Sequence, residues 1–185
     1  SAERHRELPL LYFNAKKRFY PQVRKVVIAT PFYELKAFSP YVVSLVGTLK
    51  LMGQLGIECS FMEISGDSYV HRARNTICDQ FLRNPDMTDL FFIDSDMSWD
   101  PNAFVKMIFF PEDIIGASYP VKNRWDAWTS VPSLTQQDGK NIMTGKPLKD
   151  GTALIDAQVL AGGFLRIKRR ALEKFREKYP DDFYL

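Results

Sequence analysis

Short apolar runs alternate along this chain with segments in which apolar residues recur every three or four positions. The runs are typical of buried strands and lie at residues 26–31, 57–64, 90–93 and 113–119. The periodic segments are typical of helices and lie at residues 39–52, 69–82 and 101–109. Strands and helices that alternate in this way predict an α/β domain with a mostly parallel central sheet flanked by helices.

Two of these helices carry start signals. Ser39 and Pro40 predict an N-cap serine followed by a proline in the first turn, and Asp100 with Pro101 predicts the same arrangement later in the chain. The apolar positions of the first helix recur with helical spacing and are expected to form its inward face; they are Val42, Val43, Val46, Leu49, Leu51 and Met52.

Residues 120–158 break the alternation, because they are rich in glycine and proline and show little periodicity. Short strands at 130–134 and 153–157 are expected to form a small antiparallel addition there. Regular patterns return at 159–167 with a tight turn that leads into a strand, followed by a final helix at 168–179, in which Leu172 and Phe175 are expected to face inward. The cations of this last region are expected to form a solvated face, paired in part with Glu173 and Glu177: Arg166, Lys168, Arg169, Arg170, Lys174, Arg176 and Lys178.

Composition places the chain among ordinary globular proteins. Its 185 residues fit one domain at 26–185 after a basic amino-terminal extension at 1–25, and the hydrophobic content is 45%. The net charge of +3 permits an anionic substrate without requiring nucleic acid. Cys59 and Cys78 lack the spacing of a metal site and are expected to be free thiols. No apolar run reaches the length of a membrane span, so we expect a soluble, cytoplasmic protein.

The strongest chemical signal is a pair of acids at the end of the apolar run 90–93. Asp94 and Asp96 are separated by one residue, and in an extended segment such side chains point to the same side. Two carboxylates this close repel each other unless a cation lies between them, and oxygen ligands suit Mg²⁺ or Mn²⁺. The alternative is that one aspartate caps the next helix and the other is solvated, although Asp100 is the better cap.

Four motifs in order resemble a GT-A fold glycosyltransferase of the family-2-like kind found in bacterial and phage proteins. They are Ile-Ala-Thr-Pro at 28–31, Arg-Ala-Arg-Asn at 72–75, a DxD motif at 94–96, and Gly-Ala-Ser-Tyr-Pro at 116–120 followed by Ala-Gly-Gly-Phe at 161–164. The resemblance implies a Rossmann-like nucleotide-diphospho-sugar transferase. Such an enzyme moves a sugar from a nucleoside-diphosphate sugar, with a UDP-sugar favoured, to an acceptor such as a saccharide or modified DNA.

The resemblance also implies roles for individual residues. Asp94 and Asp96 would hold Mn²⁺ or Mg²⁺ against the diphosphate. The remaining donor contacts would come from Thr30, Pro31 and Asp67 near the base and ribose, from Arg74 and Asn75 near the base or phosphates, and from Lys122. Gly162 and Gly163 would let the backbone approach the sugar or acceptor, and Trp125 and Trp128 would stack on it. An ordinary turn for the glycines and a covered core edge for the tryptophans are equally open.

The chain departs from the family pattern in one respect. Such families place a catalytic acid and a metal-binding histidine after the strand and helix that here begin at Gly162, whereas His5 and His71 both precede the DxD motif. Asp181 and Asp182 are the candidates for the missing acid. The chain is therefore expected either to be incomplete at its carboxyl end or to lack part of the catalytic set.

Two other classes fit the same pattern. One is a catalytically silent nucleotide-sugar or carbohydrate-binding module. The other is a nucleotidyltransferase, against which residues 30–34 contain no glycine. A P-loop enzyme is excluded, because the sequence has no GxxxxGK[ST] motif. The sequence leaves open whether transfer inverts or retains the anomeric configuration, and it leaves the oligomeric state open.

Overall fold

The computed structural model describes residues 24–32, 36–66, 69–117, 119–121, 124–128, 134–137, 140–143 and 160–180, and between 120 and 143 it describes the backbone alone. The central elements are β1 (Lys25–Phe32), α2 (Ser39–Gln54), β2 (Glu58–Ser65), α3 (Val70–Arg83), β3 (Asp89–Ile93), α4 (Pro101–Phe109), β4 (Ile114–Gly116), β9 (Phe164–Lys168) and α5 (Arg169–Lys178). Each of the predicted central strands and helices is present, with ends shifted by a few residues.

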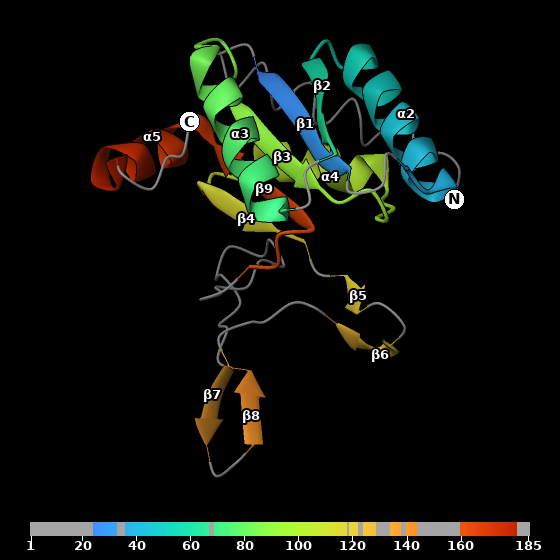
Figure 1. Ribbon diagram of the computed structural model, residues 1–185. Helices are drawn as coiled ribbons and strands as arrows, with labels where there is room; N and C mark the ends of the chain where they lie inside the picture. Colours follow the sequence, from blue (N-terminus) through green and yellow to red (C-terminus); the bar gives the residue numbers. More distant parts are fainter. Residues whose placement is uncertain are drawn as a thin grey trace.

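One five-stranded mixed sheet, in the order β2-β1-β3-β9-β4, forms the centre of the fold (Figure 1). β1 pairs in parallel with β2 and β3, whereas β9 runs antiparallel to both β3 and β4. The expectation of an α/β domain with a mostly parallel sheet is confirmed in this coarse form. Pro31 does not end β1, which continues to Phe32 where it pairs with β2 alone.

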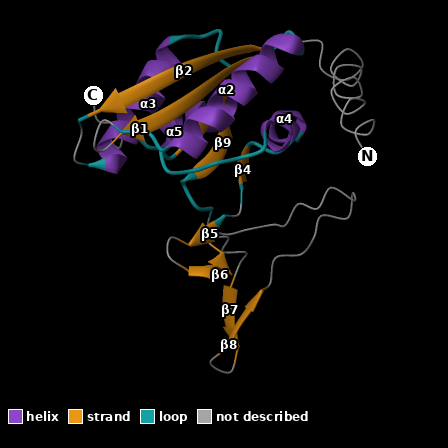
Figure 2. Ribbon diagram, turned by 90° about the vertical axis from the view of Figure 1, so that its right-hand side faces the viewer, coloured by secondary structure: helices purple, strands orange, loops and turns teal. Residues whose placement is uncertain are grey.

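The strands alternate between two apolar layers. On one face Val26, Ile28, Phe91 and Ile93 pack with α2 and α4. On the other face their neighbours, among them Val27, Ala29, Leu90 and Phe92, pack with α3 and α5. Because side chains in a strand point alternately to opposite faces, strands that are apolar throughout are covered on both sides. The result is a helix–sheet–helix sandwich (Figure 2).

The start and the inward face of α2 differ from the prediction. The N-cap is Phe38 rather than Ser39, which is the first helical residue and forms no side-chain cap. Val42, Val43 and Val46 face outward, with Val43 70% exposed. The serine cap and the valine face were therefore wrong, whereas Asp100 does cap α4 by accepting a hydrogen bond from the backbone N–H of Asn102 at 2.8 Å.

Polar contacts explain the turned face of α2. Its buried residues include Ser44 and Thr48 beside Tyr41 and Met52. The Ser44 hydroxyl accepts from the backbone N–H of Trp99 at 3.0 Å, and the Thr48 hydroxyl accepts from the indole N–H of Trp99 at 2.8 Å. These bonds satisfy polar groups that would otherwise be buried at a cost. They also fix the loop that follows Asp96 to α2.

Between β4 and β9 the structure describes two small antiparallel pairs. β5 (Pro120–Val121) pairs with β6 (Arg124–Trp128), and β7 (Leu134–Gln137) pairs with β8 (Lys140–Met143). Antiparallel pairing is thus present in this region. The strand expected at 130–134 overlaps β7 only at Leu134, and the one expected at 153–157 lies outside the described residues.

Two arginines predicted to be solvated instead bind the ends of helices. Arg166 is fully buried in β9 and donates to the carbonyls of Met107 at 2.7 Å, Ile108 at 3.2 Å and Phe110 at 3.1 Å, where α4 ends. Arg169 donates to the carbonyl of Phe81 at 2.9 Å, at the end of α3. A cation at a helix carboxyl terminus satisfies unpaired carbonyls and faces the negative end of the helix dipole.

The structure also differs from other expectations for the two ends of the chain. Lys168 is buried at the end of β9, and Phe175 is exposed on α5, although Leu172 does face inward. At the amino end, Lys25 is the first residue of β1, so the boundary expected after residue 25 falls inside the sheet. Residues 1–23 lie outside the described part.

Both cysteines are free, as expected. Burial raises the pKa of the Cys59 thiol to about 12 and that of Cys78 to about 11. Because the thiolate is the reactive form, neither is suited to nucleophilic chemistry near neutral pH. Within the described ranges, no helix is both long enough and apolar enough to cross a membrane.

Candidate functional site

The candidate site lies at one edge of the central sheet. β1, β2, β3 and β4 all run in one direction and end at this edge, whereas antiparallel β9 begins there. The topology therefore brings Asp94, which follows β3, next to Gly162 and Gly163, which precede β9. Open α/β sheets bind their ligands at the carboxyl ends of their strands.

Asp94 and Asp96 lie in a turn, not in an extended segment. β3 ends at Ile93, and the backbone N–H of Met97 donates to the carbonyl of Asp94 at 3.0 Å. The argument that alternation along a strand makes both side chains point the same way was therefore wrong. The turn nevertheless keeps the two carboxylates close enough for the charge of Asp96 to act on Asp94. Asp94 is partly buried and Asp96 is exposed.

Arg74 is the direct partner of Asp94. Its guanidinium, on the first turns of α3, donates to Asp94 Oδ1 at 2.8 Å and to the carbonyl of Gly162 at 3.1 Å. It also lies over the Phe92 ring, 5.7 Å from the ring centre. One side chain thus joins α3, the turn after β3 and the loop before β9.

The electrostatics of Asp94 reflect this setting. Burial raises the pKa of its carboxyl group, the positive charge and hydrogen bond of Arg74 lower it, and the charge of Asp96 raises it again. The net direction is upward. The arginine therefore does not fully offset the cost of an ionised carboxylate here, and further positive charge would stabilise the ionised form.

Gly162 and Gly163 permit close approach of protein side chains. A Cβ on Gly162 would lie 2.5 Å from Arg74 Nη1, and a Cβ on Gly163 would collide with the Tyr119 hydroxyl and lie 3.0 Å from Asp94 Oδ2. The backbone N–H of Gly163 donates to that hydroxyl at 3.0 Å. Gly162 and Gly163 were predicted to let the backbone approach a sugar or acceptor; in the structure the groups that approach them are Arg74 and Tyr119.

Gly163→Ala is accordingly expected to lower the melting temperature, because the added methyl must displace Tyr119 or Asp94. A cost of about 1–3 kcal/mol is expected from such overpacking. Gly53→Ala is the matched control: a Cβ there meets nothing within 4 Å and lies in helix α2, so it should stabilise the protein by about 0.5–1 kcal/mol. Thermal unfolding of both variants checks this, and an unchanged Gly163→Ala would show that the loop adapts freely.

The other candidate residues are placed differently. Thr30 is fully buried and its hydroxyl is hydrogen-bonded to that of Tyr41, so its side chain does not face the edge as a ligand contact. Pro31 and Asn75 are half-buried near the edge. Asp67, Lys122, Asp181 and Asp182 lie outside the described residues, and for Trp125 and Trp128 only the position on β6 is described.

Sequence reasoning missed Tyr119 as a site residue. Tyr119 could have been found from its position shortly after β4, because β4 ends at the same edge of the sheet as β1 and β3. Arg74 was found, but with a different partner: it was expected to reach the base or phosphates, and it contacts Asp94.

The residues present fit a divalent cation that takes few ligands from the protein. Among the described residues no group of three or more His, Cys, Asp or Glu side chains is placed to hold a metal. Two oxygen donors, one of them with a raised pKa, match the way Mg²⁺ is bound when one or two carboxylates and substrate phosphates share its shell.

Comparison with known proteins gives a fold likeness. The crystal structure of A197 from STIV matches this chain with a TM-score of 0.50 and 21% sequence identity, covering 81% of this chain and 68% of that one. At this identity the likeness shows a shared α/β fold and carries no function with it. No family model matches the chain, and no curated protein matches it.

Proposed function

We propose that this protein is a metal-dependent glycosyltransferase of the GT-A type, using a nucleoside-diphosphate sugar as donor. The observation that carries the proposal is the arrangement of Asp94, Asp96 and Arg74 at the carboxyl edge of the sheet. Two interacting carboxylates, one with a raised pKa, form a site that gains from an added cation. The DxD motif and its flanking motifs supply the family resemblance.

In this proposal Asp94 and Asp96 hold Mn²⁺ or Mg²⁺, which when bound supplies Lewis-acid stabilisation of the charge on the leaving diphosphate. Arg74 keeps Asp94 in place through Oδ1, and its guanidinium would add positive charge that helps to stabilise the leaving diphosphate. Tyr119 fixes the loop before β9 by accepting from Gly163. The acceptor and its catalytic base stay unassigned.

Metal-dependent binding of the donor tests the proposal. UDP, GDP and their sugar conjugates should raise the melting temperature only when Mn²⁺ or Mg²⁺ is present. At a ligand concentration a hundredfold above Kd, the free energy of unfolding should rise by about 2.7 kcal/mol. UMP is the matched control, because it has a single phosphate in place of the diphosphate. A ligand set that shifts nothing in the presence of metal contradicts the proposal.

The second candidate is a silent nucleotide-sugar-binding module, because none of the described residues at the site is assigned as the base that an acceptor would need. It predicts the same metal-dependent shift with no turnover. Release of free nucleoside diphosphate from the sugar conjugate, with candidate saccharide acceptors and with water alone, separates the two functions.

A further inference from the structure

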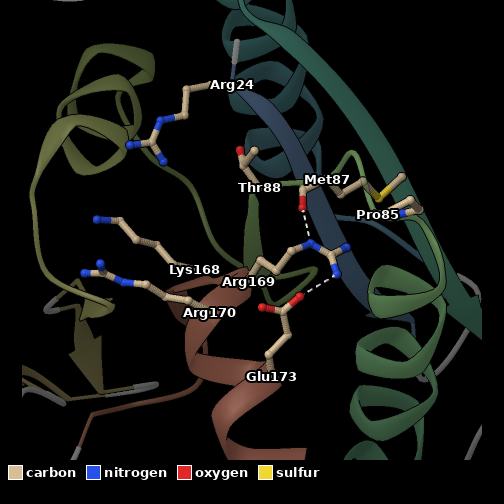
Figure 3. Close-up of a pocket in the computed structure, with 8 residues that line it drawn as sticks. All are labelled: Arg24, Pro85, Met87, Thr88, Lys168, Arg169, Arg170 and Glu173. Atoms are coloured by element: carbon tan, nitrogen blue, oxygen red, sulfur yellow. Dashed lines mark hydrogen bonds and ion pairs between the residues drawn. The ribbon is translucent and has the colours of Figure 1, made fainter. Parts of the chain in front are cut away.

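A second group of charged side chains lies at the opposite edge of the sheet, where β1 and β3 begin and β9 ends. It lines a cavity of about 410 Å³ (Figure 3). Four of the eight lining residues are cations, Arg24, Lys168, Arg169 and Arg170, and Glu173 is the acid among them. The sequence prediction of a solvated basic face did not foresee this pocket.

The four cations divide into two groups. Arg169 turns toward α3 and the loop that follows it, donates to the Met87 carbonyl in that loop at 2.6 Å, and pairs with Glu173 of α5 at 3.2 Å (Figure 3). The charged ends of Arg24, Lys168 and Arg170 point away from α3, to the left of Arg169 in Figure 3, and the charges of Arg24 and Arg170 act on Lys168. This second group is called the basic triad below.

The partners of the triad leave Lys168 short of negative charge. Arg24 pairs with Asp89 at 3.0 Å, and Arg170 pairs with Asp113. Lys168 as a whole residue is 9% exposed, and its ammonium donates to the carbonyl of Pro111 at 2.7 Å, an uncharged acceptor. That bond uses one of the three N–H donors of a lysine.

The neighbours of Lys168 confirm the excess of positive charge. Burial lowers the pKa of its ammonium, and the charges of Arg166, Arg24 and Arg170 lower it further, against an upward contribution from Asp89. A cation surrounded by cations in a partly buried site is stabilised by any anion that enters.

We propose that this cavity binds a small phosphate-type anion, inorganic phosphate or a phosphate monoester, between the ammonium of Lys168 and the guanidinium groups of Arg24 and Arg170. Guanidinium groups match phosphate oxygens with paired donors, and lysine adds a point charge. The triad is held in place before binding, because Lys168 is fixed by Pro111, Arg24 by Asp89 and Arg170 by Asp113. The volume leaves room for a small ester group beside the phosphate.

Titration calorimetry with inorganic phosphate and with glycerol phosphate tests the site, at constant ionic strength set by sodium chloride. Arg170→Gln is the informative variant, since its side chain is 61% exposed and the fold should tolerate the change. It is expected to weaken phosphate binding roughly tenfold, or about 1.4 kcal/mol. Arg176→Gln, an exposed change on the same helix outside the cavity, should leave binding unchanged.

The outcomes separate this site from the proposed donor site. Binding that survives Asp96→Ala and needs no Mn²⁺ supports an independent anion site, and tighter binding of glycerol phosphate than of phosphate identifies the ester as the better ligand. Lys168→Met, which keeps the buried stem and removes the central charge, should abolish binding. The proposal is overturned if phosphate gives no more heat than chloride, or if the Arg170 and Arg176 variants lose phosphate affinity equally. The triad is then a structural cluster.

Discussion

Arg166→Met is expected to lower the free energy of unfolding by about 3–5 kcal/mol, a large part of the stability of a domain of this size. The guanidinium is fully buried and binds three carbonyls at the end of α4. Methionine fills similar space but donates no hydrogen bond. Those carbonyls would then be buried without a hydrogen-bond donor. Asp89, also fully buried and 4.0 Å from Arg166, would lose a neighbouring cation as well.

Urea denaturation measures this effect, with Arg83→Met as the control. Arg83 forms an i,i+4 pair with Asp79 and its side chain is 67% exposed, so its loss should cost no more than about 0.5 kcal/mol. A variant that is already unfolded without urea agrees with the prediction. If Arg166→Met stays within about 1 kcal/mol of the unaltered protein, then the buried arginine is not needed to satisfy the end of α4.

Asp96→Ala is expected to weaken metal-dependent binding of a nucleoside diphosphate by roughly 100-fold or more, because one of two proposed metal-binding carboxylates is removed. The side chain is exposed in a turn, so unfolding should stay cooperative with little change in stability. Calorimetry with UDP at fixed Mn²⁺ gives the affinity directly.

The control for this experiment is Asp86→Ala. Asp86 is an exposed carboxylate that pairs with Lys25 at 3.3 Å, near the start of β1 and β3 rather than at their ends. It removes the same charge from the molecule while leaving the candidate site intact. Equal binding by Asp96→Ala and the unaltered protein would show that the metal, if bound, is held elsewhere.

The order of strands and helices could be predicted because it depends on local patterns. Continuous apolar runs give β1 and β3, and Asp100 with Pro101 gives the start of α4. The antiparallel direction of β9 could not be predicted in this way. A strand carries the same period-two pattern whichever way its neighbours run, so direction follows from the path of the chain between elements.

Burial of polar residues was the main source of error. Apolar periodicity placed Val43 inward and gave no reason to bury Ser44 or Thr48, whose partner Trp99 lies on a different element. Arg166 was assigned to a solvated face because the carbonyls that satisfy it come from a distant helix. Such partners become visible only when the chain is folded.

At the candidate site the motif was predictable and the geometry was not. Two acids after an apolar strand could be found by inspection, and they lie at the expected edge of the sheet. Their relation depends on a turn rather than on strand alternation, and Arg74 reaches Asp94 from α3, an element that ends before β3 begins. Neither the turn nor the contact with Arg74 can be predicted from the spacing of the two aspartates.

The position of β9 has a consequence for biogenesis. It is synthesised after β3 and β4, yet it lies between them in the sheet. Until β9 has emerged from the ribosome, β3 can pair with β1 on one side only, and its other edge stays open. An open strand edge is prone to pair with other chains. Contacts between distant segments also form slowly. The sheet therefore cannot be completed before β9 has emerged, and until then the nascent domain exposes an edge that a chaperone can cover.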